Sequence, residues 1–164
     1  MATAWAARHG LTSDQYQVEF DKLVGQGFRL VHVNGYTVAG SDRYAAIWDK
    51  SPSPGWVARH GMTSAQYQAE FDTRVAQGFR LVEVSGYTVN GSDRYAAIWD
   101  KTPSPGWSAR HGMTSAQYQA EFDKHVGLGF RLVLVSGYEV NGQDRYAAIW
   151  SKAGGPAWAA RHGL

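Results

Sequence analysis

Arginine, histidine and glycine stand together four times in this 164-residue chain, in strings that begin at Arg8, Arg59, Arg110 and Arg161. Histidine is the usual proton carrier near neutral pH and a common metal ligand, and a neighbouring arginine can bind an anion. An Asp-Arg-Tyr string recurs as well, starting at Asp42, Asp93 and Asp144. These residue types are the ones that acid–base chemistry, phosphate binding or ligand binding would use.

The spacing of these strings reveals a repeat of 51 residues, whose copies open at Trp5, Trp56, Trp107 and Trp158. An internal period of this size is typical of stacked or ring-arranged units that pack against their neighbours. A catalytic group is normally needed once, whereas each reactive side chain here occurs three or four times in the same local sequence. The repeat therefore favours architecture or repeated binding over catalysis.

The middle copy predicts a helix after its Arg-His-Gly string. Thr63 followed by Gln66 is a capping-box pattern, and Tyr67, Phe71 and Val75 form an apolar stripe at helical spacing. A glycine shortly after the stripe suits the left-handed end of a helix. The other two copies keep the same pattern.

Two strands and a short extended segment follow the helix. Residues 79–84 alternate in a β pattern, Ser85-Gly86 indicates a bulge or bend, and Asn90-Gly91 is typical of a hairpin turn. Residues 94–99 then form a second strand and 107–111 a third, short one. We therefore expect an α+β fold of three tandem repeats, each with one helix and a small antiparallel sheet.

The expected boundaries are 5–55, 56–106, 107–157 and a partial fourth repeat, 158–164, that caps the array. Short proline-rich connectors indicate that neighbouring repeats are docked and not loosely tethered. A closed ring would need only three Trp-x-Ala-Arg-His-Gly segments, but the chain has four. This favours an open array, with a ring as the alternative.

Composition excludes several classes of protein. The formal net charge is +2 and the basic residues are scattered, which argues against a nucleic-acid partner. The absence of cysteine excludes disulfides and thiolate metal sites. No apolar run approaches the ~18 residues of a membrane span, and the first residues lack the pattern of a signal peptide. We expect no cofactor.

Arg59-His60-Gly61-Met62-Thr63 resembles the R-H-G-x-T motif of the histidine phosphatase superfamily, in which the histidine accepts the phosphoryl group and the arginine binds phosphate. Here the string follows Pro-Gly-Trp instead of a buried apolar strand, and the chain has no room for the larger α/β domain that supplies the other catalytic groups. A lone histidine with an aspartate would be a poor zinc site. We expect no catalytic and no metal-binding residue, with a phosphatase-like or hydrolase activity as the alternative.

The recurring aromatic, Arg, His and Asp side chains are the candidate ligand-binding residues, because aromatic faces stack on sugar rings while charged groups bind hydroxyls. Structural roles compete, since the Asp can close a turn and the Arg can form packing ion pairs. We predict the site in a cleft between repeats near Trp107, Arg59, His60 and Asp93. The full set is Arg8, His9, Asp42, Arg43, Tyr44, Trp56, Arg59, His60, Asp93, Arg94, Tyr95, Trp107, Arg110, His111, Asp144, Arg145, Tyr146 and Trp158.

Three positions change chemistry between the copies, and such changes are easiest where a side chain faces solvent. We therefore expect these positions to point outward. They are His32/Glu83/Leu134, Thr37/Thr88/Glu139 and Leu23/Arg74/His125.

Four strings identify a resemblance that covers essentially the whole chain: W-x-A-R-H-G-[LM]-T, Q-Y-Q-x-E-F-D, G-F-R-L-V-x-V-x-G-Y and D-R-Y-A-A-I-W. The chain resembles the bacterial tandem repeat that also forms the N-terminal, non-catalytic region of fungal polyglycine hydrolases. In those proteins a separate β-lactamase-like domain carries the serine chemistry, and nothing here corresponds to it. The resemblance implies an accessory, recognition or spacer region of a secreted protein. We expect a non-catalytic module that binds a carbohydrate, or else an extended peptide or protein, through repeated weak sites.

Overall fold

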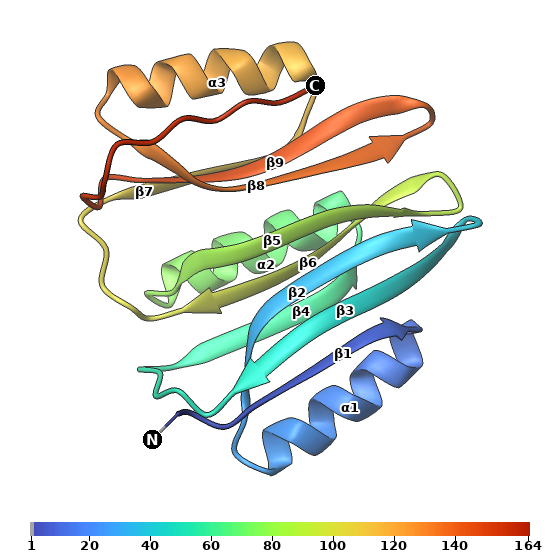
Figure 1. Cartoon of the computed structure of the whole chain (residues 1–164). Coiled ribbons are helices and arrows are strands. Elements are labelled where there is room, and N and C mark those ends of the chain that lie inside the picture. Colours follow the sequence, from blue (N-terminus) through green and yellow to red (C-terminus); the bar gives the residue numbers. More distant parts are fainter. Residues whose placement is uncertain (1) are drawn as a thin grey trace.

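The computed structural model describes residues 2–164, and each of its three repeats contributes one helix and a three-stranded antiparallel sheet (Figure 1). This confirms the predicted α+β repeat fold. The elements are β1 (Trp5–Leu11), α1 (Ser13–Gly25), β2 (Arg29–Val38), β3 (Ser41–Asp49), β4 (Trp56–Met62), α2 (Ser64–Ala76), β5 (Arg80–Val89), β6 (Ser92–Asp100), β7 (Trp107–Met113), α3 (Ser115–Gly127), β8 (Arg131–Val140) and β9 (Gln143–Ser151).

All three helices begin with the predicted capping box. In α2, the Gln66 backbone N–H donates to Thr63 Oγ1, and the Thr63 backbone N–H donates to Gln66 Oε1. Tyr67 is buried beneath the helix, but Val75 is 40% exposed, so the predicted stripe is wrong at its last position. Arg74 lies on the packed side instead, with its Nε atom 3.0 Å from Glu70 Oε2.

The strands of each repeat are ordered first-third-second, so the short strand pairs within the repeat that it opens. The prediction of a bulge or bend at Ser85-Gly86 is wrong, because β5 continues through both residues and its register shifts between Leu81 and Glu83. Asn90 and Gly91 have φ values of 49° and 78°, which confirms the predicted hairpin turn.

The repeats stack as an open array, with the two termini at opposite ends (Figure 1). In the first core, Leu30 and Trp48 of the first repeat pack with Ala96 and Ile98 of the second. The second core joins repeats two and three in the same way. A sheet in the middle of the array is therefore buried on both faces.

The helix position occupied by Leu23, Arg74 and His125 does not point outward as predicted, since Leu23 and His125 are each only 4% exposed. His125 stacks on Trp150 at a centroid distance of 4.4 Å, and its Nε2 atom lies 2.9 Å from Ser108 Oγ. The change of chemistry is tolerated because the facing strand position changes as well, with a serine only where the helix carries histidine.

The strand positions divide in the same way. His32, Thr37 and Glu139 are exposed, as predicted. Glu83 and Leu134 do not point freely outward, since Glu83 Oε1 lies 2.9 Å from His32 Nδ1 and Leu134 packs against the second core. Thr88 is buried between neighbouring repeats. Its backbone N–H donates to Thr37 Oγ1 at 3.1 Å. The outward orientation predicted for this position is wrong in the middle repeat, because the first repeat covers it.

Candidate functional site

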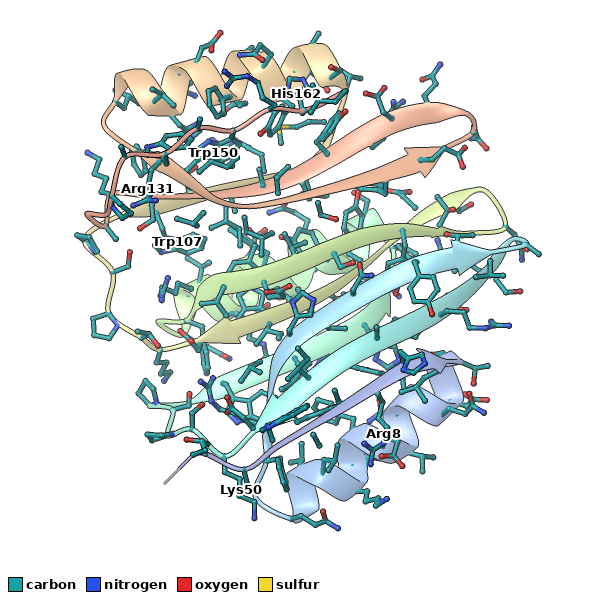
Figure 2. All side chains as sticks on the ribbon, viewed as in Figure 1. Arg8, Lys50, Trp107, Arg131, Trp150 and His162 are labelled. Carbon is teal, nitrogen blue, oxygen red and sulfur yellow. The ribbon has the colours of Figure 1, made fainter. Side chains whose placement is uncertain are left out.

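The repeated polar residues meet at three equivalent joints, each formed by the helix of one repeat and the Trp-x-Ala-Arg-His-Gly segment that follows it. Joint 1 lies between α1 and β4, and joint 2 between α2 and β7. The terminal joint lies between α3 and the terminal segment, Trp158–Leu164, whose His162 lies beside the helix in Figure 2. At each joint a tryptophan packs edge-on against a phenylalanine of the helix. The ring centroids of Trp107 and Phe71, for example, are 5.7 Å apart.

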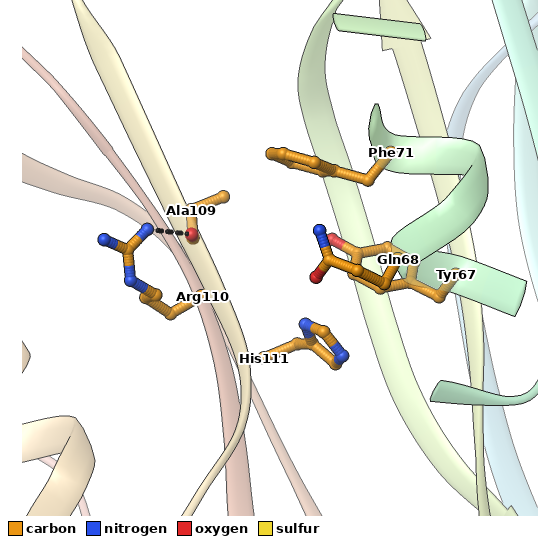
Figure 3. Close-up of a pocket in the computed structure, with 6 residues that line it drawn as sticks. All are labelled: Tyr67, Gln68, Phe71, Ala109, Arg110 and His111. Atoms are coloured by element: carbon orange, nitrogen blue, oxygen red, sulfur yellow. Dashed lines mark hydrogen bonds between the residues drawn. The ribbon is translucent and has the colours of Figure 1, made fainter. Parts of the chain in front are cut away.

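The histidines of the last three strings point into the joints, as Figure 3 shows for His111. His111 Nε2 lies 2.9 Å from Ser64 Oγ, and its ring packs edge-on against Tyr67 and Tyr95. His60 and His162 make the same serine contact in the other two joints, at 3.0 and 3.1 Å. Burial lowers the pKa of His60 and of His111, and nearby aspartates only partly oppose it. These two imidazoles are therefore neutral at pH 7.

The arginines of the first three strings point to the other side of their strands, because successive strand residues face opposite directions. Arg110 Nε lies 3.7 Å from Glu121 Oε2 on the helix of its own repeat, and its guanidinium donates to the Ala109 carbonyl oxygen. Figure 3 shows it directed away from Tyr67. Arg8 and Arg59 pair with Glu19 and Glu70 in the same way. In joint 2, Arg110 and His111 border the same cavity, but the guanidinium is paired with Glu121 and the imidazole with Ser64.

The Asp-Arg-Tyr strings build a hydrogen-bond chain, partly buried, through each internal joint. In joint 2, the Gly112 N–H donates to the Tyr138 hydroxyl, which lies 2.5 Å from the Tyr95 hydroxyl, and Tyr95 donates to Asp93 Oδ2 at 3.0 Å. Burial raises the pKa of Tyr95 and of Tyr138, so both phenols stay protonated. The Asp and Tyr residues of the string therefore serve the joint itself.

The residues predicted to share one cleft lie in different places in the structure. Trp107, Asp93 and Tyr95 meet at joint 2, whereas His60 lies in joint 1 and Arg59 faces α2. Arg94 donates to the Asp93 carbonyl and stands opposite Tyr87 across the sheet.

The remaining predicted residues occupy equivalent places in the other repeats. Asp42, Tyr44 and Trp56 belong to joint 1, and His111 to joint 2. Asp144, Tyr146 and Trp158 belong to the terminal joint. Arg43 and Arg145 repeat the backbone contact of Arg94. Arg8 and His9 lie exposed on β1, which follows no helix in this chain.

One cavity that opens to solvent lies at each joint, with volumes of about 210, 370 and 280 Å³ from the first to the last. The sequence predicted only the arginine and the histidine of the lining at the two internal joints, and none of the lining at the terminal joint. It missed above all the helix residues that face the histidine. Their repetition as Gln-Tyr-Gln strings was visible, but nothing in the sequence placed them against the following repeat. The lining residues are Tyr16, Gln17, Phe20, Ala58, Arg59 and His60; Tyr67, Gln68, Phe71, Ala109, Arg110 and His111; and Tyr118, Gln119, Phe122, Ala160, Arg161 and His162.

Two properties of the described chain bear on its class. Among residues 2–164, no cluster of three or more His, Asp or Glu side chains is arranged to hold a metal ion. None of the helices in that range is long and apolar enough to cross a bilayer.

Comparison with known families gives one assignment. The sequence matches the family described as "Polyglycine hydrolase-like, structural repeat" three times, at residues 2–51, 53–102 and 104–153. The matches cover almost the whole chain, and the chain therefore belongs to this structural repeat family.

Proposed function

We propose that this chain is a non-catalytic module that binds neutral carbohydrate at its three joint cavities. The observation that carries the proposal is that the same six residue types line a cavity at each of the three joints. Repeated sites on one rigid array gain avidity when the ligand presents repeated units.

The chemistry of the cavity favours a neutral, hydroxyl-rich ligand. In joint 2, Tyr67 and Phe71 supply the aromatic surface, and Gln68 supplies an amide whose nitrogen is held by Asp72 at 2.9 Å. The Gln68 amide oxygen and the second ring nitrogen of His111 are the neutral polar groups that remain for a ligand in this cavity. Arg110 also lines the cavity, but its Nε atom lies 3.7 Å from Glu121 Oε2, so the charge of this arginine is offset by a carboxylate.

A second candidate, a spacer that only holds other domains apart, is supported by the family's description as a structural repeat. The two functions differ in their ligand stoichiometry. A carbohydrate module should bind about three ligands per chain, one for each cavity, whereas a spacer should bind none.

A glycan array followed by titration calorimetry tests the proposal. Changing Gln68 to Leu should reduce the stoichiometry by one site, and changing Gln17 and Gln119 as well should abolish binding. These side chains are exposed, so the fold should be kept. Gln26→Leu, at an exposed position beyond α1, is the matched control and should change nothing. Absence of binding across the array would support the spacer function instead.

A further inference from the structure

The two ends of the array expose the two halves of the interface that joins its repeats. The term start face is used for the exposed surface of the first sheet. It is formed by Tyr36, Val38, Ala45 and Ile47, together with Trp5. Ile47 is 39% exposed, whereas its equivalents Ile98 and Ile149 are 1% and 2% exposed because the preceding repeat covers them.

The end face lies on the third sheet, beside the terminal joint, and includes Val135 and Gly137. Val135 is 43% exposed, although the equivalent Val33 and Val84 are 1% and 2% exposed beneath the following repeat. Each end face is thus apolar at positions that the internal repeats bury against one another.

A tyrosine ring lies directly against a glycine in each internal interface. A Cβ atom added to Gly35 would lie closer than 3.0 Å to the ring of Tyr87, and one on Gly86 would meet Tyr138 in the same way. At the ends the pair is separated. Tyr36 of the start face has no glycine beneath it, and a Cβ on Gly137 would contact only the ring of Tyr146, at 3.6 Å.

The polar groups of the interface are also available at the ends. Within the array, the Gly86 N–H donates to Ser136 Oγ at 3.0 Å, and the Gly35 N–H donates to Ser85 Oγ. Asn34 occupies the corresponding position of the start face and is exposed. Its side-chain oxygen accepts from Ser85 Oγ at 3.5 Å within the chain and can accept a second bond, from Gly137 of another copy. The hydroxyl of Tyr36 can reach Tyr146 as Tyr87 reaches Tyr44 at 2.6 Å.

The sequences of the two end segments agree with such a match. Trp5–Leu11 and Trp158–Leu164 both read W-A-A-R-H-G-L, whereas β4 and β7 begin W-V-A and W-S-A and end in methionine. The terminal segment contacts α3 but pairs with no strand, and β1 pairs with β3 but contacts no preceding helix. A single copy of the heptapeptide can satisfy both sets of contacts, as β4 and β7 do.

We propose that copies of this chain associate head to tail, with the start face of one copy on the end face of the next. β1 of the incoming copy replaces the terminal segment on α3. The terminal segment leaves more readily than β1, because β1 is held by its paired register from Trp5 to Leu11 along β3. The contact joins two different surfaces, so repeated association builds a filament, or a ring if the rotation closes.

Sedimentation velocity of the full chain over a concentration series provides the first test. The average mass should rise with concentration up to about 100 µM, above the micromolar range in which weak interfaces of standard size assemble. Gly137→Ala and Tyr36→Ala should each weaken association at least about tenfold, with unchanged circular dichroism and melting temperature. Val18→Ala removes a 65%-exposed apolar side chain from the outer surface of α1 and should leave association unchanged.

A mixing experiment tests the head-to-tail arrangement itself. Gly137→Ala keeps an intact start face, and Tyr36→Ala keeps an intact end face, so their equimolar mixture should form a dimer and nothing larger. A wild-type chain that stays monomeric throughout the series would overturn the proposal. So would single variants that associate like the wild type, or a mixture that stays monomeric or grows beyond the dimer.

Discussion

The internal joints and the terminal joint contain the same side chains but differ in how the backbone supports them. His111 and His162 both contact a serine at the start of a helix and pack on two tyrosines. His111 belongs to a paired strand, whereas His162 belongs to a segment without strand pairing. The comparison shows that the contacts with the preceding helix are sufficient to hold this heptapeptide in place.

The comparison also explains why the Arg-His-Gly string recurs. The two internal copies each join two repeats, with histidine on the preceding helix and arginine on the helix of their own repeat. The C-terminal copy makes only the histidine contact, through His162 and Ser115. At the N-terminal copy only the arginine contact is made, through Arg8 and Glu19, while His9 is exposed. The string therefore connects neighbouring repeats. Its histidine contact and its arginine contact can be tested separately at the two termini.

The largest effect should come from adding one methyl group where the sheets of two repeats pack together. Gly86→Ala should destabilise the chain by about 3 kcal/mol, because the Cβ would overlap the ring of Tyr138 in a packed interface. Gly137→Ala, at the equivalent open position, should change the free energy of unfolding by less than about 0.5 kcal/mol. Urea denaturation at low protein concentration measures both. Equal losses of unfolding free energy at the two sites would show that the contact with Tyr138 is not the reason for a glycine at position 86.

Removing one hydroxyl from the internal hydrogen-bond chain should have the next largest effect. Tyr138→Phe should cost about 1–3 kcal/mol, because Gly112 N–H and the buried Tyr95 hydroxyl both lose a partner. Tyr36→Phe is the matched control, since the Tyr36 hydroxyl makes no hydrogen bond within residues 2–164, and its cost should be close to zero. A Tyr138→Phe variant with unchanged stability would contradict a stabilising role for this hydrogen-bond chain.

Acid should weaken the internal joints through His60 and His111. Burial lowers the pKa of both residues in the folded state, so their contribution is complete above the unfolded pKa of about 6.5 and is lost as the pH falls toward the lowered values. His32 acts in the opposite direction, because the hydrogen bond to Glu83 raises its pKa. In a His32→Gln background, the unfolding free energy should fall between pH 7.5 and 5.5, and adding His60→Gln and His111→Gln should flatten this dependence.

The smallest effect concerns the three hairpin turns. Asn90 and Asn141 occupy the left-handed position that asparagine tolerates, but the first turn places Ala39 there with φ of 49°. Ala39→Asn should stabilise the chain by about 0.5–1 kcal/mol, and Asn90→Ala should cost a similar amount. Thermal denaturation of the two variants beside the wild type checks this. A destabilising Ala39→Asn would show that other contacts determine this turn.

The features that were predictable from the sequence are the local ones. The Thr63–Gln66 capping box and the Asn90-Gly91 turn depend on residues a few positions apart, and both formed as expected. The strand order and the burial of His125 depend on contacts between residues far apart in the chain. Local periodicity carries no information on such contacts.

The candidate site was predictable in composition but not in arrangement. The sequence indicated that histidine, arginine and aromatic residues recur between the repeats. It could not show that His60 and Arg59 face different helices, because that depends on which helix covers each side of β4. The local sequence likewise indicates a bend at Gly86. The actual reason for this glycine is the ring of Tyr138, which lies in the next repeat and cannot be inferred from neighbouring residues.

Hydrogen exchange of two double variants tests most directly whether each Trp-x-Ala-Arg-His-Gly segment completes the preceding repeat. Trp158→Ala/His162→Ala and Trp5→Ala/His9→Ala alter the same residues of the same heptapeptide at opposite ends of the chain. The C-terminal pair should reduce amide protection in α3 and leave α1 unchanged, because Trp158 and His162 contact Phe122 and Ser115. The N-terminal pair should leave all three helices protected. Unchanged protection of α3 in the C-terminal variant, or an equal loss in α1 from the N-terminal one, would contradict the account.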